Sequence, residues 1–535
     1  MAFAPLGFIL SLVALAALTH GQSQEFWNTQ ALDALNEALS RQNLNKNEAK
    51  NIIFFLGDGM SLTTVTAARI LKGQLQGNPG EETFLSWESF PHVGLAKTYS
   101  IDAQVPDSAG TATAFFCGVK SYAGAVGVDG TGKRGDCAST LDGYVDSVLK
   151  EANLADKSTG IVSTARLTHA TPACTYAHAA DRNWEKDGDL PSDAVTNGCT
   201  DIASQLIDHS EIQIALGGGR LEFLPNTVND PEYLTTTGER TDGRNLVDEW
   251  KAKHPNKAAY VWNKEQFDQV DPENIDFLFG LFEPDYMQYE ASRKDDEAGE
   301  PSIADMTEKA IRILRKNEKG FFLAVEGGRI DHAHHASVAY NALHDTLAMD
   351  EAVIRALELT DTSDTLIIVT ADHSHTMAFA GYPDRGHDIL ETPLKPSGKL
   401  DGAVDGLPYT TLGYLNGPGG YITSLSFAVN GRRPNLTDTE TNSRSHVVES
   451  LVHLDKETHG GDDVPIYASG PFAHLFHTVH EQHYIAHVMR YAGCLGDGRM
   501  SCTDPPEVNE CNGALVHQIG FILLVISFLI YHCLC

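Results

Sequence analysis

The chain has 535 residues, of which 42% are hydrophobic, and its formal net charge is −33 at pH 7. It is long enough for one large domain with insertions or for two domains. The acidic balance excludes a nucleic-acid-binding surface, because such a surface needs a basic face. We expect most of the excess carboxylates on a solvated surface and the rest to be available as metal ligands.

Residues 1–21 predict a secretory signal peptide. The apolar run is FAPLGFILSLVALAAL, and it is followed by Thr19 and Gly21, which are small enough for the cleavage site. The mature chain would then begin near Gln22. We therefore expect the protein to enter the secretory pathway.

Four apolar runs predict buried parallel strands. They are NIIFFLGDG from residue 51, GIVSTARLTHA from 160, GFFLAVEGGRID from 320 and TLIIVTADHSH from 365. Segments with helical periodicity, such as 302–317 and 338–359, lie between them. This alternation predicts an α/β fold with helices on both faces of one central, mostly parallel sheet.

Side chains that can bind metal ions follow these strands. Because ligands bind beyond the carboxyl ends of parallel strands, we expect these side chains to meet at one edge of the sheet. Taken singly, each has an ordinary alternative: an Asp after a strand often caps a helix, and an Asp and a His four residues apart often form a local ion pair. Together they match zinc, which prefers carboxylate with imidazole, and magnesium, which prefers oxygen. The candidates are Asp58, His169, Thr171, Glu326, Asp331, His335, Asp372 and His373.

The segment VPDSAGTATAFFCG places Ser108 at the start of a helix of small residues. A metal ion beside this serine would lower the pKa of its hydroxyl, and the helix end would favour an arriving anion. His459, in the sequence THGG, would alone be more typical of a surface histidine than of a ligand.

Two further segments have distinctive composition. Between about 381 and 446 the chain is rich in Gly, Pro, Thr and Asn, which predicts a small inserted subdomain. The chain ends in ALVHQIGFILLVISFLIYHCLC without a basic tail. This ending favours a glycosylphosphatidylinositol (GPI) attachment signal over 513–535, with Asn512 as the attachment residue and a short spanning helix as the alternative.

Cysteines in a secreted protein are expected to form disulfides. Cys137 and Cys199 would close a long loop and Cys494 and Cys502 a short one, but spacing alone does not determine the pairing. Cys117 and Cys174 are left for the apolar core or for a third bridge. The acceptor sequence at Asn435 predicts N-glycosylation on an exposed loop.

Five segments resemble the signature segments of animal alkaline phosphatases, in the family's order. They are VPDSAGTATAFFCGVK, THATPACTYAHAADRNWE, VEGGRIDHAHH, TADHSHT and ETHGGDDVPIYASGP, and the resemblance covers nearly the whole mature chain. It implies a catalytic domain over 22–512 that hydrolyses a broad range of phosphate monoesters at alkaline pH through a covalent phosphoserine. It also implies a homodimer, held on the outer face of the cell membrane by a GPI anchor, in which 381–446 forms the crown and the helix around 27–42 embraces the partner subunit.

The resemblance assigns roles to the candidate residues. Ser108 would be the nucleophile, and Arg182 would bind two phosphate oxygens through its planar guanidinium. His169 would orient waters of the third metal ion. The metal ligands would be Asp331, His335 and His459 for one zinc ion, Asp58, Asp372, His373 and the Ser108 oxygen for the second, and Asp58, Thr171 and Glu326 for magnesium. Thr171 stands where animal members usually have serine.

The resemblance also implies a calcium site and two disulfides. Glu232, Glu283 and the backbone carbonyl of Phe282 match the calcium segments, and Glu300 is the best match for the last ligand. Glu300 ends a small insertion, RKDDEAGEP, so a solvated acidic loop is the alternative reading. The implied disulfides pair Cys137 with Cys199 and Cys494 with Cys502.

Two other functions compete with monoester hydrolysis. A phosphodiesterase or sulfatase of the same superfamily would lack the magnesium ligands Thr171 and Glu326. A catalytically silent receptor or mineral-binding protein would have lost some ligands. Every ligand is present in this chain, which favours an active monoesterase.

Overall fold

The computed structural model describes residues 28, 30–32, 44–393, 403–421 and 425–496. The predicted signal peptide, most of the segment 27–42, Cys502, Asn512 and the predicted GPI signal lie outside the described residues. Within them, no helix combines the length and the hydrophobicity that crossing a membrane requires.

A ten-stranded sheet forms the centre of the molecule, in the order β15-β2-β14-β8-β1-β7-β3-β4-β6-β5. Only β14 runs antiparallel to its neighbours, which confirms the prediction of a mostly parallel sheet. The strands are β1 (Asn51–Gly57), β2 (His92–Lys97), β3 (Ser158–Arg166), β4 (Ile214–Gly218), β5 (Ala258–Val261), β6 (Phe277–Leu281), β7 (Phe321–Gly327), β8 (Thr365–Ala371), β14 (Val464–Ser469) and β15 (Val479–Glu481).

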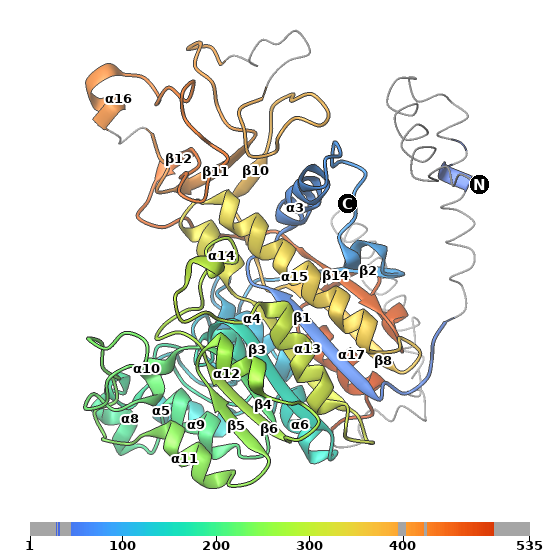
Figure 1. Cartoon of the computed structure of the whole chain (residues 1–535), viewed down its shortest axis with the longest axis vertical. Helices are drawn as coiled ribbons and strands as arrows, with labels where there is room; N and C mark the ends of the chain where they lie inside the picture. Colours follow the sequence, from blue (N-terminus) through green and yellow to red (C-terminus); the bar gives the residue numbers. More distant parts are fainter. Residues whose placement is uncertain (1–27, 29, 33–43, 394–402, 422–424, 497–535) are drawn as a thin grey trace, which may run out of the picture.

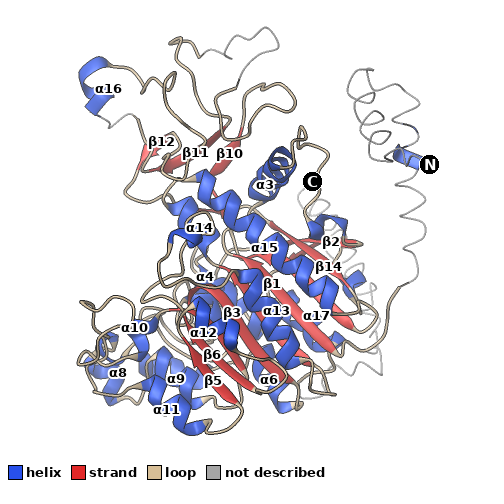
Figure 2. Ribbon diagram, viewed as in Figure 1, coloured by secondary structure: helices blue, strands red, loops and turns tan. Residues whose placement is uncertain are grey.

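Helices cover both faces of this sheet (Figures 1 and 2). On one face lie α13 (Ile303–Leu314) and α15 (Ala339–Leu359), close to the predicted bounds, and on the other lie α6 (Val148–Leu154) and α17 (Tyr484–Ala492). The other helices are α3 (Leu62–Leu75), α4 (Ser108–Ala112), α5 (Cys137–Thr140), α7 (Ala170–Ala173), α8 (Ser192–Thr196), α9 (Ile202–Asp208), α10 (Arg220–Phe223), α11 (Leu246–Lys253), α12 (Lys264–Gln269), α14 (Arg329–His335) and α16 (Leu425–Asn430).

The four predicted strands are the adjacent central strands β8, β1, β7 and β3. Both faces of the sheet are covered, so β7 and β8 are buried along their whole length, which explains the unbroken apolar runs. The register aligns their ends: Gly57 of β1 pairs with both Gly327 of β7 and Ala371 of β8. The residues that follow these positions therefore meet at one edge of the sheet.

A small separate sheet projects beyond the main body (Figure 1). It consists of β10 (Met377–Phe379), β11 (Leu412–Gly417) and β12 (Ser450–His453), with β11 antiparallel to β10 and parallel to β12. Its outer strands lie just outside the range 381–446, because an inserted sheet is held by the strands through which the chain leaves and returns. A two-stranded ladder of β9 (Ser374–His375) and β13 (His459–Gly460) lies between this sheet and the main one in sequence.

Aromatic packing supports the segment that carries Ser108. The helix α4 continues into a π-helical turn, Thr113–Cys117. Phe115 and Phe116 of this turn pack on Phe54 of β1, with ring centroids 5.2 Å apart in both pairs. The nucleophile candidate is thus attached to the core of the central sheet.

The cysteines separate into bonded and free pairs. Cys137 and Cys199 form a disulfide, as the resemblance implied. Cys117 and Cys174 are buried free thiols, so they belong to the apolar core and not to a third bridge. Cys494 is disulfide-bonded, and its implied partner Cys502 lies outside the described residues.

Replacing both Cys137 and Cys199 by alanine should lower the free energy of unfolding by about 4 kcal/mol, because the bond spans 62 residues of the unfolded chain. Urea denaturation under oxidising conditions measures this difference. As a control, a reducing agent should destabilise the wild-type protein more than the double variant. Equal unfolding midpoints for the two proteins would contradict the prediction.

Candidate active site and metal centre

The first group of candidate ligands lies at the ends of β1 and β8. Asp58, Asp372 and His373 offer ligand atoms that all lie within 4.8 Å of one another, and all three residues are fully buried. The amide N–H of Gly59 donates to Asp372 Oδ1 at 2.8 Å. Gly59 has a φ of +65°, and a Cβ there would lie 2.3 Å from the ring of His375, so only glycine fits this turn.

Ser108 contributes its hydroxyl to this group. Its Oγ lies 3.4 Å from His373 Nε2, and the side chain is almost completely buried. Asp107 caps α4 by accepting from Gly110 N–H, which fixes the start of the helix and with it Ser108. Ser108 therefore lies beside the metal-ligand candidates.

A second group joins α14 to the β13 strand. His335 Nε2 and His459 Nε2 each lie 3.4 Å from Asp331 Oδ1, and the two nitrogens are 3.2 Å apart. The ring of His459 also stacks on that of His373, with centroids 3.6 Å apart. The two groups are thus immediate neighbours.

The protonation of these three histidines follows from their second ring nitrogen. A carbonyl oxygen can only accept, so each Nδ1 facing one carries the proton and each Nε2 presents a lone pair. Lone pairs that face one another and carboxylate oxygens repel, and a cation between them removes the repulsion. The donor set thus fits zinc. The Nδ1 contacts are His335 to the Glu457 carbonyl at 2.5 Å, His459 to that of Pro106 at 2.8 Å, and His373 to that of Ser374 at 3.3 Å.

His375 differs from these ligands. Its Nε2 lies 2.7 Å from Asp331 Oδ1 and its Nδ1 lies 2.5 Å from Glu457 Oε2, so both nitrogens donate. Burial alone would lower the pKa of His375, but the hydrogen bonds to Asp331 and Glu457 raise it to about 9. Because both ring nitrogens face carboxylate oxygens, His375 holds Asp331 in place and presents no free lone pair to a metal ion.

The third group lies at the ends of β1, β7 and β3. Asp58, Glu326 and His169 offer atoms within 4.8 Å of one another. Thr171 Oγ1, Glu326 Oε1 and both oxygens of Asp58 are buried without a hydrogen-bond partner among the described residues, and such atoms fit a cation with its waters. The oxygen-rich donor set fits magnesium.

His169 lies against this group in a fixed tautomer. Arg182 Nη2 donates to its Nε2 at 2.8 Å, so Nδ1 carries the proton, and this buried N–H has no partner among the described residues. Burial, and next the charge of Arg182, lower the pKa of His169 well below its ordinary value. A protonated Nδ1 cannot ligate a metal ion but can donate to a metal-bound water.

The charges of these groups also require cations. Burial raises the pKa of Asp58 well above its ordinary value, and the nearby Asp372, Asp331 and Glu326 raise it further. Burial raises the pKa of Glu326 to about 7. A site that works with these carboxylates ionised therefore needs positive charge among them.

Arg182 is held at the edge of the centre by two contacts. Its Nη1 donates to Asp107 Oδ2 at 2.9 Å, and its Nη2 contacts His169 as described. Asp107 also accepts from the N–H groups of Gly110 and Gly124. Burial alone would raise the pKa of Asp107, but the charge of Arg182 and these hydrogen bonds lower it below its ordinary value. The guanidinium is therefore fixed in orientation by Asp107, the residue before Ser108, and by His169.

An acidic group lies apart from this centre. Glu232, Glu283 and Asp296 bring carboxylate oxygens within 4.8 Å of one another. Glu300, which the sequence suggested, is not in this group: it is buried, and its Oε1 accepts from the N–H of Gln288 at 2.9 Å. The insertion thus contributes Asp296, four residues before Glu300, to this acidic group, and Phe282 is buried next to Glu283 in the chain.

Sequence reasoning missed two residues of the centre, His375 and Glu457, and one of the separate acidic group, Asp296. His375 and Glu457 lie in the segments TADHSHT and ETHGG, each two residues from a candidate ligand, so alternation along an extended chain was the signal for them. Asp296 lies inside the insertion, where no spacing rule applied.

Asn435 is exposed, as a glycosylation site requires.

Comparisons with known proteins identify the family. Residues 49–495 match the family model described as alkaline phosphatase. The chain is 48% identical over 484 residues to the tissue-nonspecific alkaline phosphatase of Homo sapiens, covering 89% of this chain and 90% of that one. It is 48% identical over 480 residues to the alkaline phosphatase of Gadus morhua, covering 89% and 98%.

Solved structures share the fold. The alkaline phosphatase of Thermus thermophilus superposes with a TM-score of 0.61 at 23% identity, covering 86% of this chain and 94% of that one. The enzyme of the Antarctic bacterium TAB5 gives 0.57 at 22% identity, covering 84% and 99%. The chain therefore belongs to the alkaline phosphatase family and is a metal-dependent hydrolase of phosphate monoesters.

Proposed function

We propose that Ser108 is the nucleophile of this hydrolase and forms a covalent phosphoserine with a broad range of monoesters. The observation that carries the proposal is the contact of Ser108 Oγ with His373 Nε2, beside two adjacent groups of metal ligands. In the first step the Ser108 oxygen bonds to phosphorus while the bond to the alcohol oxygen breaks. In the second, water displaces Ser108 and releases inorganic phosphate.

The metal ions are assigned by their donor sets. Asp331, His335 and His459 would hold one zinc ion, Asp58, Asp372, His373 and Ser108 the second, and Asp58, Thr171 and Glu326 a magnesium ion. When bound, zinc lowers the pKa of a coordinated hydroxyl or water and neutralises the leaving oxygen, and magnesium holds ordered waters.

The remaining roles belong to side chains that orient and bind. Arg182 would bind two phosphate oxygens through its planar fork, and Asp107 and His169 hold that fork in place. His375 would keep Asp331 ionised and correctly turned. Because these contacts surround the phosphoryl group, discrimination among leaving alcohols would be weak, which supports a broad substrate range.

Export, anchoring, glycosylation and dimerisation are further parts of the proposal. The sequence signals at both ends support secretion followed by GPI attachment on the outer face of the cell membrane, and the exposed Asn435 supports glycosylation. Apolar side chains of the small projecting sheet support a homodimer through the crown, because half or more of each is exposed: Leu415, Leu451 and Val452.

Ser108→Ala should reduce kcat for a chromogenic phosphate monoester at least about a thousandfold, because the alanine side chain has no oxygen that could attack phosphorus. The matched control is Ser121→Ala, a buried serine outside every metal group, which should keep its activity. The assay is run at about pH 9.5, and the rates for diester and sulfate analogues are compared with the rate for the monoester. Full activity of Ser108→Ala, or faster cleavage of the diester, would refute the assignment.

Thr171 allows a direct comparison of two conservative changes. Thr171→Ser should leave the magnesium dependence of activity unchanged, because it keeps the hydroxyl and removes only a methyl group. Thr171→Val keeps the shape and removes the hydroxyl, so magnesium affinity should fall at least about tenfold. Magnesium content and titration of the metal-depleted protein measure both; similar affinities for the serine and valine variants would exclude Thr171 as a ligand.

We propose that Glu232, Glu283, the Phe282 carbonyl and Asp296 hold a calcium ion, with Glu300 supporting the loop. Asp296→Asn should weaken calcium binding about tenfold, or about 1.4 kcal/mol, because it removes a charge from a site of carboxylates. Glu297→Gln, an exposed neighbour, is the matched control. The readout is the rise in melting temperature with calcium; an equal response in the two variants argues against Asp296 as a ligand.

A further inference from the structure

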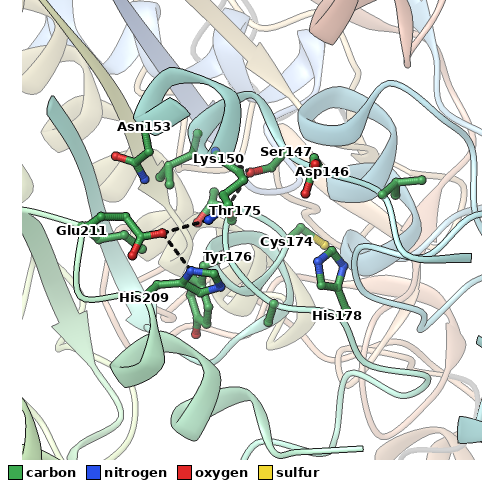
Figure 3. A pocket seen from close by; sticks show the side chains of 14 residues that line it. Asp146, Ser147, Lys150, Asn153, Cys174, Thr175, Tyr176, His178, His209 and Glu211 are labelled. Atoms are coloured by element: carbon green, nitrogen blue, oxygen red, sulfur yellow. Dashed lines mark hydrogen bonds and ion pairs between the residues drawn. The ribbon is translucent and has the colours of Figure 1, made fainter. Parts of the chain in front are cut away.

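A pocket that is separate from the metal groups lies on the α6 side of the central sheet. Its volume is about 150 Å³, and it is lined by residues from three stretches of chain, 145–153, 174–178 and 209–212 (Figure 3). None of the residues assigned above to metal or phosphate contributes to its lining. The proposed mechanism therefore gives this pocket no role.

The wall of the pocket is largely apolar. Leu149, Ala177 and Ile212 line it and are buried, as is the ring of Tyr176. The Tyr176 hydroxyl donates to the carbonyl of Leu167 at 2.9 Å and is not available to a ligand. A space of this size with apolar walls accommodates about one six-membered ring.

Three titratable groups of the lining contact one another, and a fourth, Asp146, is exposed to solvent. Glu211 Oε1 accepts from Lys150 Nζ and from His209 Nδ1, both at 3.0 Å (Figure 3). Ser147 Oγ donates to the carbonyl of Thr175 at 2.5 Å. Since these groups already have partners, a charged ligand would lose hydration without gaining a counter-charge.

Asn153 is the exception. Its Oδ1 accepts from Thr159 Oγ1 at 2.9 Å, which turns the amide so that Nδ2 is the free end. Nδ2 is buried without a hydrogen-bond partner, and in Figure 3 it is the end of the side chain nearer to the other lining residues. A buried donor without an acceptor is unfavourable, so a ligand that supplies an acceptor here would be stabilised.

We propose that this pocket is a binding site for a small, uncharged, mainly apolar ring compound whose single hydrogen-bond acceptor, such as a carbonyl oxygen, accepts from Asn153 Nδ2. The apolar wall would take the ring, and Asn153 would fix its orientation. The contacts among Lys150, His209 and Glu211 leave these groups without a free counter-charge for an ion, and the exposed Asp146 disfavours an anion.

The pocket also touches the framework of the nucleophile. Cys174 lines it, and the thiol of Cys174 donates to the carbonyl of Ala109, the residue after Ser108, at 3.5 Å. Cys174 directly follows α7, which carries Thr171. An occupant in contact with Cys174 would therefore change kcat for a monoester without competing with it; this second step rests on the function proposed for Ser108.

Fluorine NMR of the metal-loaded full chain, with saturating inorganic phosphate to fill the active site, tests binding. The probes are 4-fluoroacetophenone, which carries the acceptor, and fluorobenzene, which does not. Asn153→Leu should raise the Kd of the ketone about fivefold and leave that of fluorobenzene unchanged, because only the ketone loses a hydrogen bond. Equal Kd values for the ketone in wild type and variant would overturn the site.

Ala177→Leu places a larger side chain in the pocket. It should therefore abolish the broadening of the fluorine NMR signals that binding to the protein causes for both probes. If this variant fails to fold, Asn153→Leu still decides the question. The ketone should change kcat of the wild type and not its KM, and the effect should weaken in Asn153→Leu in proportion to Kd. An unchanged kcat at saturating ketone would overturn the coupling, whereas loss of the Ser108 assignment is detected separately by Ser108→Ala.

Discussion

The structure depends on the crowding of buried acids at the carboxyl ends of four adjacent strands. The ends of β8, β1 and β7 are aligned, so the buried Asp58 lies within 4.8 Å of Asp372 in one group and within 4.8 Å of Glu326 in another. Their repulsion and burial favour the neutral forms. Metal cations reverse that preference, and the family's dependence on metal follows from this one constraint.

Loops outside the sheet determine how the histidines meet those acids. Backbone carbonyls of Glu457, Pro106 and Ser374 each take the Nδ1 proton of one histidine and leave Nε2 free. Asp107 has a comparable position for the phosphate side, because it caps the Ser108 helix and pairs with Arg182. Nucleophile and anion-binding group thus share one carboxylate, which keeps their separation constant.

The sequence was sufficient for four adjacent strands of the central sheet, and it named residues that the structure brings together at their ends. Unbroken apolar runs occur only where both faces of a strand are covered, so β1, β3, β7 and β8 could be read directly, and the chemistry at their ends followed. The role of His375 could not be read, because whether a histidine ligates or donates depends on the group facing its second nitrogen. Asp296 could not be read either, since the path of an insertion is determined by packing and not by periodicity. The disulfide of Cys137 and Cys199 came from the resemblance, because spacing allows several pairings.

The short β9–β13 ladder has a consequence for protein engineering. His375 and His459 are direct partners in the ladder. The segment between them therefore forms a loop whose two ends are held together at the centre. The entropy cost of closing such a loop changes only slowly with its length. Exposed turns of the projecting sheet are therefore suitable points for grafting a peptide epitope or a small binding module. The graft would lengthen this loop, while the ladder would keep the residues at its two ends together.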